Sequence, residues 1–327
     1  METMLSATAI TKLRDGKLLL ATTYNGLFIE KDGEWKQALT GFQKRIRDLH
    51  SEGNVVYGVG DEGVFIRSMN GGETWTIQRF PTKATSWNVC SNENGTVIAH
   101  GDKTLYHSNN FGSTWETIQP FLNYGSEAPS IRSLFLYKHY LFIGTKIHTK
   151  YGGVWLFDLE TRKLKRIKIA MNQMISALTI HNSYLVAASG SCKGISGNIS
   201  FCRINESIES DKIGWHTCQS EQKASSYLDL SVDQHVLYTT STQNKAGIST
   251  VCRVLLEEGI VTVCDSVKGH GWRIVNEKEG YVVAGSGELK TMQWKKKSCI
   301  TLKKTLLLLY WYDIVTLNHF TFNNIEI

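Results

Sequence analysis

Three arginines occupy what we interpret as one equivalent position in three similar short strands. The strands are Ile46-Arg47-Asp48-Leu49, Ile131-Arg132-Ser133-Leu134 and Trp272-Arg273-Ile274-Val275. A guanidinium is a planar fork of N–H donors whose geometry matches a carboxylate or a phosphate. If these strands lie side by side, the three arginine side chains converge. The sequence therefore predicts a site for an anionic ligand.

Two tryptophans and one asparagine belong to the same predicted site. In a fourth strand, Trp87-Asn88-Val89-Cys90, the asparagine takes the position of the arginines, and a tryptophan precedes it as Trp272 precedes Arg273. Indole rings offer stacking faces beside such cations. The candidate ligand-binding residues are thus Arg47, Asn88, Arg132, Arg273, Trp87 and Trp272. In the alternative interpretation, carboxylates such as Asp48 or Asp229 neutralise the arginines in structural ion pairs.

The strands that must position these residues belong to a repeat that runs along the chain. An apolar five-residue strand recurs seven times, beginning at Leu18, Val55, Thr96, Tyr140, Tyr184, His235 and Tyr281. A turn and a further strand follow each copy, and the position that opens this strand recurs at intervals of 37 to 50 residues. Such units predict an all-β fold, a seven-bladed β-propeller of four-stranded antiparallel blades. A β-sandwich array or a solenoid is the alternative.

The spacing also divides the chain into units. We expect one propeller over residues 1–305 and a tail over 306–327 that either closes the ring as a strand or packs loosely. The predicted blades span about 7–42, 43–83, 84–123, 128–169, 172–222, 224–267 and 270–305. In this arrangement the strands that carry the arginines are the innermost strands, which line the central channel.

Two turns share the pattern S-x-N-x-G-x-T-W, forty residues apart. They contain Ser68, Asn70, Gly72, Thr74 and Trp75, and Ser108, Asn110, Gly112, Thr114 and Trp115. Glycine takes positive φ without steric cost, and the short polar side chains can bond the backbone of the turn. The tryptophan then opens the next strand and buries a large ring. Truncating Trp75 or Trp115 to alanine should destabilise the fold by roughly 3–5 kcal/mol.

This pattern resembles the Asp-box, or BNR repeat, S-x-D-x-G-x-T-W, with asparagine in place of aspartate. The resemblance implies a degenerate structural turn between the third and fourth strands of a propeller blade. Sialidases share Asp-boxes and clamp a sugar carboxylate with three arginines, but they also need an acidic residue and a Tyr–Glu pair. Here Tyr227 with Asp48 and Asp229 is the nearest match, and no glutamate pairs with the tyrosine.

The chain also resembles the photosystem II assembly and stability factors and the bacterial and phage proteins similar to them. Their inner strands often carry Trp-Arg-Asp followed by an apolar residue, and Ile46-Arg47-Asp48-Leu49 and Trp272-Arg273-Ile274-Val275 come close to this motif. The resemblance covers about residues 7–300 and implies a seven-bladed, non-catalytic propeller.

Composition indicates a globular protein without a nucleotide or metal motif. No phosphate-binding loop and no Cys-x-x-Cys pair occur among 327 residues with seven cysteines, and we expect no cofactor and no metal. We interpret the cysteines as free buried thiols in a reducing compartment. The beginning of the chain lacks the features of a secretory signal, and no apolar run is long enough for a membrane helix. We therefore expect a cytoplasmic protein.

The net charge of +6 is too diffuse to predict nucleic-acid binding, and basic pairs such as Lys44-Arg45 are interpreted as solvated surface. The sequence thus predicts a non-catalytic binding module or scaffold. It would capture an acidic peptide, a glycan or another anionic ligand at an arginine-lined channel mouth. A protein or acidic peptide is the first partner class and a glycan the second. The alternative function is a glycan-active hydrolase of the sialidase-like group.

Overall fold

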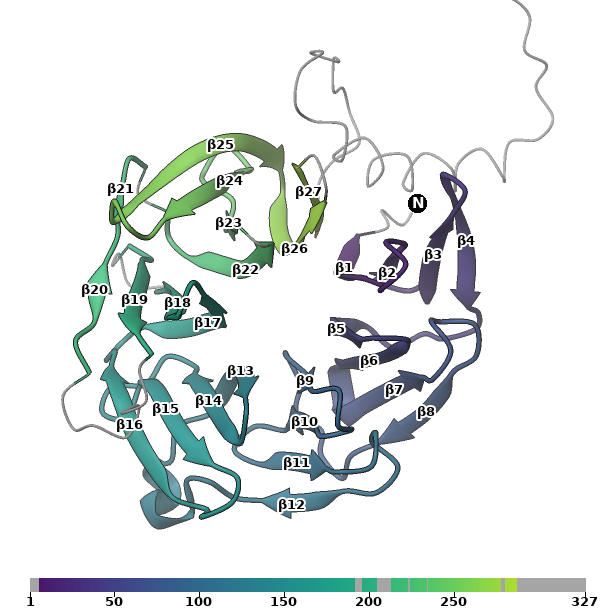
Figure 1. The fold of residues 1–327 in the computed structure, drawn as a ribbon, viewed down its shortest axis with the longest axis horizontal. Coiled ribbons are helices and arrows are strands. Elements are labelled where there is room, and N and C mark those ends of the chain that lie inside the picture. Colours follow the sequence, from purple (N-terminus) through teal and green to yellow (C-terminus); the bar gives the residue numbers. More distant parts are fainter. Residues whose placement is uncertain are drawn as a thin grey trace, which may run out of the picture.

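The chain forms a ring of antiparallel β-sheets around a central channel (Figure 1). The computed structural model describes residues 6–191, 196–204, 213–222, 224–233, 235–277 and 280–286. Within this part, six sheets each contain four antiparallel strands that follow one another in sequence order from the channel outward, and one of these sheets has a fifth strand at its outer edge. We call these sheets blades one to six. The all-β propeller with four-stranded antiparallel blades is therefore confirmed.

The first three blades comprise twelve strands. Blade one contains β1 (Ala7–Lys12), β2 (Leu18–Thr22), β3 (Leu27–Lys31) and β4 (Glu34–Leu39). Blade two contains β5 (Ile46–Glu52), β6 (Val55–Gly60), β7 (Val64–Ser68) and β8 (Thr76–Arg79), with the short η1 (Asp61–Gly63) before β7. Blade three contains β9 (Cys90–Ser91), β10 (Val97–His100), β11 (Leu105–Ser108) and β12 (Glu116–Ile118), and η2 (Leu122–Glu127) follows it.

The remaining strands complete the ring. Blade four contains β13 (Ile131–Tyr137), β14 (Tyr140–Thr145), β15 (Gly153–Asp158) and β16 (Leu164–Ile169). Blade five contains β17 (Met174–His181), β18 (Tyr184–Gly190), β19 (Ile199–Arg203) and β20 (His216–Thr217). Blade six contains β22 (Tyr227–Asp233), β23 (Val236–Ser241), β24 (Ile248–Leu255) and β25 (Ile260–Lys268), and β21 (Gln219–Ser220) pairs with β25 in parallel.

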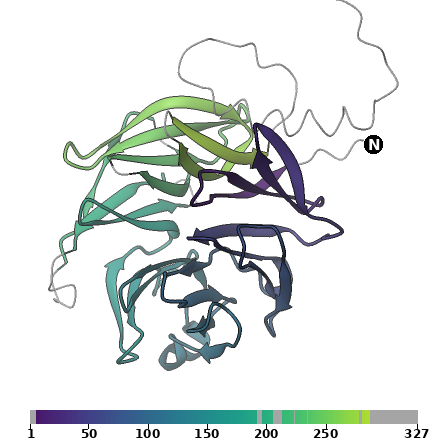
Figure 2. The same ribbon diagram turned by 45° about the vertical axis from the view of Figure 1, so that its right-hand side comes forward.

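A two-stranded seventh sheet lies between blades six and one (Figures 1 and 2). It consists of β26 (His270–Glu277) and β27 (Gly280–Ser286). The described residues thus form six four-stranded blades and not the seven that the sequence predicted. The correction concerns the unit predicted at 270–305, whose last part, like the predicted tail at 306–327, lies outside the described residues.

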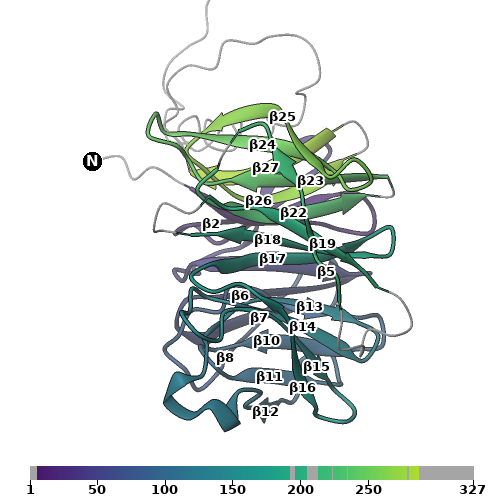
Figure 3. The same ribbon diagram turned by 90° about the vertical axis from the view of Figure 1, so that its left-hand side faces the viewer.

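Burial explains why the apolar runs form the second strand of each blade. Every residue of β2 and of β10 is buried, because these strands are covered by neighbouring sheets on both faces. The outer strands β4 and β12 are largely exposed. The innermost strands contact one another around the ring, and Figure 3 shows the disc from its side. A continuous apolar run bounded by turns is the pattern of such a doubly covered strand.

The two S-x-N-x-G-x-T-W turns join the third and fourth strands of blades two and three. In the second of them, Ser108 Oγ accepts the N–H of Gly112 at 2.9 Å, and Asn110 Oδ1 accepts the N–H of Thr114 at 2.9 Å. Ser68 and Asn70 accept the corresponding bonds in the first turn. Both Gly72 (φ 88°) and Gly112 (φ 75°) have positive φ. Polar side chains thus replace the missing ladder bonds of the turn.

Replacing Trp115 with alanine should lower the free energy of unfolding by about 3 kcal/mol. The ring packs edge-on against Phe65 and Phe80 of blade two, with centroids 4.9 Å away in each case, so its loss opens a gap between blades. Because Trp115 is only half-buried, we expect the lower end of the 3–5 kcal/mol range. Urea denaturation measures the change, and an unaltered midpoint would contradict this packing role.

The described cysteines are free thiols. Cys90, Cys202, Cys218 and Cys252 are buried, as the sequence predicted, and burial raises the pKa of the Cys218 and Cys252 thiols to about 11. Cys264 is exposed, which corrects the prediction for this residue. It lies on β25, the outer strand of blade six, where one face of the sheet meets solvent.

Candidate functional site

A cavity of about 310 Å³ opens where the inner strands begin, and we call it the mouth pocket. Five of the predicted ligand-binding residues line it, joined by residues that the sequence did not indicate. The lining is Ser6, Thr8, Thr23, Tyr24, Arg45, Arg47, Trp87, Arg132, Trp272 and Arg273. The structure therefore brings together the arginines and tryptophans that were singled out, although their roles differ.

The sequence predicted that Arg47, Arg132 and Arg273 occupy equivalent positions in their strands. This prediction is wrong for Arg273, whose position is shifted by one residue. The pairing of inner strands with second strands slips at Arg47 in β5 and at Arg132 in β13, so each of these residues forms a β-bulge. In β26 the slip falls at Trp272, and Arg273 pairs with Ala284. A bulge adds one unpaired residue and redirects the side chains beyond it. Arg273 therefore corresponds to Asp48, one residue deeper in the channel.

Arg273 closes the floor of the mouth pocket by spanning the channel. Its Nε lies 3.1 Å from Asp48 Oδ1 in blade two, and its Nη1 donates to Asp229 Oδ1 in blade six at 3.2 Å. It also donates to the backbone carbonyls of Arg47, at 3.2 Å, and of Trp87. Burial acts to lower the pKa of Arg273, but the two carboxylates outweigh it and raise the pKa. Arg273 is thus an internal ion-pair residue as much as a pocket residue.

Arg47 is also paired. Its Nε donates to Asp61 Oδ1 at 2.9 Å, and its Nη2 donates to Asp61 Oδ2 at 3.2 Å, which is a bidentate geometry. Its guanidinium lies 4.7 Å from the ring centroid of Trp87. Thr85 donates to the same aspartate at 3.0 Å, so Asp61 holds Arg47 against the indole.

Arg132 differs from both. It is 8% exposed, and it makes no ion pair or hydrogen bond with any other residue that the structure describes. Its guanidinium carbon lies 4.6 Å from the centroid of Trp87, and its Nη1 is buried without a hydrogen-bond partner. Burial and the neighbouring Arg273 lower the pKa of Arg132 to about 9. A desolvated cation without a counter-charge is costly, and such a group usually serves a site.

Arg45 and Tyr24 complete the pocket, although the sequence indicated neither of them as a site residue. The pair Lys44-Arg45 was interpreted as solvated surface. Lys44 does reach Glu62 at 2.7 Å, but Arg45 turns to the pocket, lies 6.0 Å from the ring centroid of Tyr24, and has a buried Nε without a hydrogen-bond partner. The only sequence signal was its position two residues before Arg47, at the start of an inner strand.

Asn88 does not line the mouth pocket. It lies on the far side of Arg273, in a second channel cavity of about 520 Å³. Its Nδ2 donates to Asp48 Oδ2 at 2.6 Å, and its Oδ1 accepts the N–H of Leu134 at 2.6 Å. These bonds join blades two, three and four, so the structure gives Asn88 a position between blades and away from the arginine-lined mouth.

No carboxylate belongs to the described lining of the mouth pocket. Tyr227, the nearest match to a sialidase nucleophile, is 1% exposed, and its hydroxyl lies 2.8 Å from Ser220 Oγ. Among the described residues, no group of three or more His, Cys, Asp or Glu side chains could hold a metal ion. No helix in the described part of the chain has the length and hydropathy of a membrane span.

Solved structures show the same fold at low identity. YCF48 from Cyanidioschyzon merolae is 15% identical, with a TM-score of 0.61, over 88% of this chain and 94% of that one. A structure of YCF48 bound to D1 peptide is 13% identical, with a TM-score of 0.58, over 87% of this chain and 90% of that one. At these identities the likeness concerns the fold alone.

A sequence relative gives the family. No model of a protein family matches the chain. A protein of Bacillus subtilis (strain 168), described as uncharacterized protein YkuO, is 36% identical over 290 residues, which cover 88% of this chain and 95% of the relative. At this identity and coverage, the chain belongs to the same protein family as YkuO.

Proposed function

We propose that the chain is a non-catalytic binding module that captures an anionic ligand at the mouth pocket. One observation carries the proposal: Arg132 is a buried cation that forms no ion pair with another described residue, and it lies over the Trp87 ring in the mouth pocket. A carboxylate or similar anion would supply the missing charge and hydrogen bonds. In this role Arg45, Arg47 and Arg132 face the ligand, and Tyr24, Trp87 and Trp272 provide aromatic walls.

The charge of the cluster favours a ligand with a single negative charge. In the part of the chain that the structure describes, three carboxylates pair with the four guanidiniums of the pocket: Asp61 with Arg47, and both Asp48 and Asp229 with Arg273. One positive charge is left over. A carboxylate on an apolar or aromatic body fits both this charge and the aromatic walls. A cavity of about 310 Å³ matches the lower end of the ligand-pocket range of about 300–1,000 Å³.

A peptide is the partner class that we favour. The protein YCF48, which has the same fold, has been solved bound to D1 peptide, and this supports a peptide-binding role for the fold. An acidic peptide would present the required carboxylate, and a glycan acid or another small anion are the further classes. We also propose that the turns at 68–75 and 108–115 are degenerate Asp-box turns with a structural role, and that the protein acts in the cytoplasm.

Anion affinity should fall as the pH rises above about 9, where the free protein loses the Arg132 proton. The sign follows from linkage: the anion binds the protonated guanidinium, so deprotonation near pH 9 competes with binding. Above this pH the dissociation constant should rise by about tenfold per unit. Titrations between pH 7 and pH 10 measure the effect. A constant affinity across this range would contradict a low pKa at the binding group.

The direct test is a tryptophan-fluorescence titration with benzoate, with inorganic phosphate and with a glutamate-rich peptide. Benzoate and the peptide should quench the signal, with phosphate weaker, and Trp87→Leu should remove most of the change. Arg79→Gln is the matched control, because Arg79 is an exposed arginine outside the pocket. The proposal is wrong if no anion alters the fluorescence, or if Arg45→Gln and Arg79→Gln have equal effects.

A further inference from the structure

The second channel cavity, of about 520 Å³, lies on the far side of Arg273 from the mouth pocket. Among the described lining residues the two cavities share Arg273 alone, because this side chain spans the channel between them. From there the second cavity extends to the ends of the inner strands at Lys12 and at the exposed Asp233. Its volume lies within the range of about 300–1,000 Å³ that is typical of ligand pockets. A role for this cavity goes beyond the proposed function and does not depend on it.

Three buried polar atoms in the lining of this cavity have no hydrogen-bond partner among the described residues. They are His50 Nε2, Ser91 Oγ and Asn276 Oδ1. Ser91 is 9% exposed and Asn276 is 7% exposed. A buried polar atom without a partner costs free energy, and a molecule that bonds it removes this cost. The lining therefore has unused capacity for hydrogen bonds.

The three residues lie at one depth in the channel. On the mouth side of them, hydrogen bonds and ion pairs join inner-strand residues of different sheets into one layer around Arg273. This layer contains Asp48, Val89, Asp229, Arg273 and Ile274. His50, Ser91 and Asn276 each follow a member of the layer by two residues. Two residues of a strand cover about 7 Å, so blade two, blade three and the seventh sheet each contribute one unpartnered atom to the same level of the channel.

The chemistry of these atoms specifies a ligand that both donates and accepts hydrogen bonds. Asn276 Nδ2 donates to the carbonyls of Ser231 and Val236, at 3.4 and 3.2 Å, which leaves Oδ1 as an acceptor. Ser91 Oγ can donate or accept. Burial lowers the pKa of His50, so its ring is neutral at pH 7 and Nε2 can take either role. Hydroxyl groups complement all three atoms, because each hydroxyl is a donor and an acceptor.

The charge of the second channel cavity differs from that of the mouth pocket. Its charged lining residues are Lys12, Asp48, Asp229, Asp233 and Arg273. Arg273 is bound to Asp48 and Asp229, Lys12 lies 3.7 Å from Glu277, and Asp233 has an interaction of its own. Two cations and three carboxylates leave no excess of positive charge in this described lining. An anion is therefore not favoured here, in contrast to the mouth pocket.

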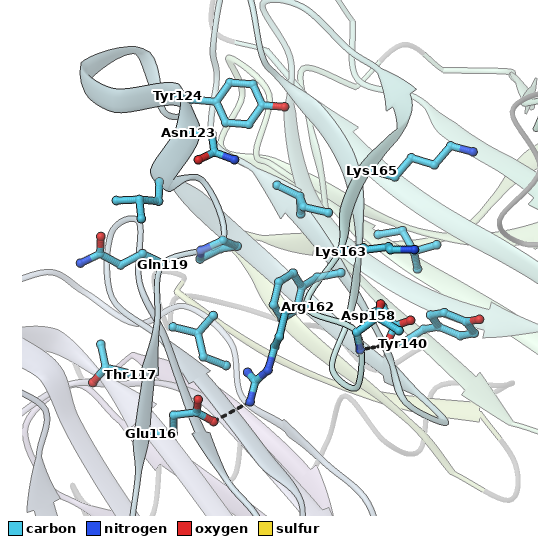
Figure 4. A pocket seen from close by; sticks show the side chains of 17 residues that line it. Glu116, Thr117, Gln119, Asn123, Tyr124, Tyr140, Asp158, Arg162, Lys163 and Lys165 are labelled. Atoms are coloured by element: carbon cyan, nitrogen blue, oxygen red, sulfur yellow. Dashed lines mark hydrogen bonds and ion pairs between the residues drawn. The ribbon is translucent and has the colours of Figure 1, made fainter.

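A larger cavity of about 1,030 Å³ lies on the outside of the ring between blades three and four, where Figure 4 shows Arg162 bonded to Glu116. None of the buried, unpartnered atoms in the described part of the chain belongs to a residue that lines it. The second channel cavity is thus distinguished by its unused hydrogen-bonding atoms and not by its size.

We infer that the second channel cavity binds a small neutral molecule rich in hydroxyl groups, a polyol or a monosaccharide. Its hydroxyls would bond His50, Ser91 and Asn276. Its C–H groups would pack against half-buried apolar side chains of the lining such as Phe135 and Leu230. One water occupies roughly 30 Å³ and can satisfy one such atom, whereas a molecule with several hydroxyls satisfies three atoms at one level and fills more of the cavity.

The test compares two series of probes that differ in charge and share a carbon skeleton. Sorbitol, gluconate and glucamine form the linear series, and glucose, glucuronate and glucosamine form the cyclic one. Saturation-transfer NMR and calorimetry measure binding at neutral pH, with and without excess benzoate as a competitor for the mouth pocket. At least one neutral probe should bind with a dissociation constant of about 1 mM or lower. Its charged counterparts should bind about tenfold more weakly, because the site offers them no matching charge.

Ser91→Ala is the decisive variant. Its hydroxyl has no described partner, so the urea midpoint of the ligand-free protein should not fall, while affinity for the neutral probe should fall about fivefold through the loss of one hydrogen bond. Adding His50→Phe should bring the loss to about 25-fold. Ser200→Ala is the matched control, because Ser200 Oγ is also buried without a described partner but lies on β19 of blade five, outside the lining of the cavity. Binding should be unchanged in this control.

Hydrogen exchange locates the site, and the neutral probe should protect residues 48–50, 89–91 and 274–276. The inference is wrong if no neutral probe gives a saturable signal, which would mean that the cavity holds water only. It is also wrong if a charged probe binds more tightly than its neutral counterpart, or if Ser91→Ala and Ser200→Ala have equal effects. Displacement of the neutral probe by benzoate would place that probe at the mouth pocket and reject the second channel cavity. The anion site is tested by benzoate alone, so its failure is a separate result.

Discussion

Replacing Arg273 with methionine is expected to lower the free energy of unfolding by about 3–5 kcal/mol. The guanidinium is buried between Asp48 and Asp229 and also binds the backbone carbonyls of Arg47 and Trp87. Methionine fills similar space but leaves the buried Asp48 and the half-buried Asp229 without a cation. Breaking a buried ion cluster by removing one member is far more costly than never having formed it.

The location of Arg273 increases the expected effect. It comes from the seventh sheet and reaches blades two, three and six, so it joins the end of the described chain to distant parts of the ring. Urea denaturation followed by circular dichroism measures the loss. Arg253→Met, which removes an exposed arginine of blade six, should change stability by less than about 0.5 kcal/mol.

A compensating variant distinguishes charge from packing. Adding Asp48→Asn and Asp229→Asn to Arg273→Met neutralises the orphaned carboxylates and should recover part of the loss, because the buried charge is gone. If Arg273→Met costs no more than Arg253→Met, Arg273 does not hold the ring together. If the triple variant is no more stable than Arg273→Met, the loss comes from the contacts with the carbonyls of Arg47 and Trp87.

The sequence was sufficient for the architecture because the repeat has a strong physical signal. Apolar runs such as Leu18–Thr22 must be covered on both faces, and their even spacing specifies a ring of sheets. The seventh four-stranded blade was not predicted correctly. Among the described residues, the sheet at this place in the ring contains only β26 and β27. The sequence predicted the residues that converge on the channel with an error of at most one position along each inner strand.

That one position determines the chemistry. The residue types in a strand do not show where a β-bulge lies. Arg273 was therefore aligned with Arg132, although its position in the strand corresponds to that of Asp48. Nor could composition show that Asp61 would pair with Arg47, because the two are brought together only by the loop before β7. The contact between blades three and four could not be predicted for a related reason: the three ion pairs that join these blades link residues 23 to 46 positions apart.

Replacing Arg132 with methionine should weaken anion binding by about 100-fold and, in the ligand-free protein, raise the free energy of unfolding by about 1–2 kcal/mol. The first effect is the loss of a desolvated cation whose partner is the ligand. The second arises because no described residue forms an ion pair with Arg132, so methionine, which can still pack on Trp87, removes a penalty of desolvation. A purely structural arginine would give the opposite sign of the stability change.

Arg47→Met is the matched control, since Arg47 lies against the same indole at nearly the same distance, 4.7 Å compared with 4.6 Å. Its guanidinium is bound by Asp61, so its removal leaves a carboxylate unpaired and should lower stability. Urea denaturation without ligand and a benzoate titration, applied to both variants, separate the two roles. If both variants lose stability and both retain benzoate affinity, the mouth pocket is not an anion site. Opposite stability changes with loss of binding in Arg132→Met would mean that the fold holds Arg132 in place for a ligand.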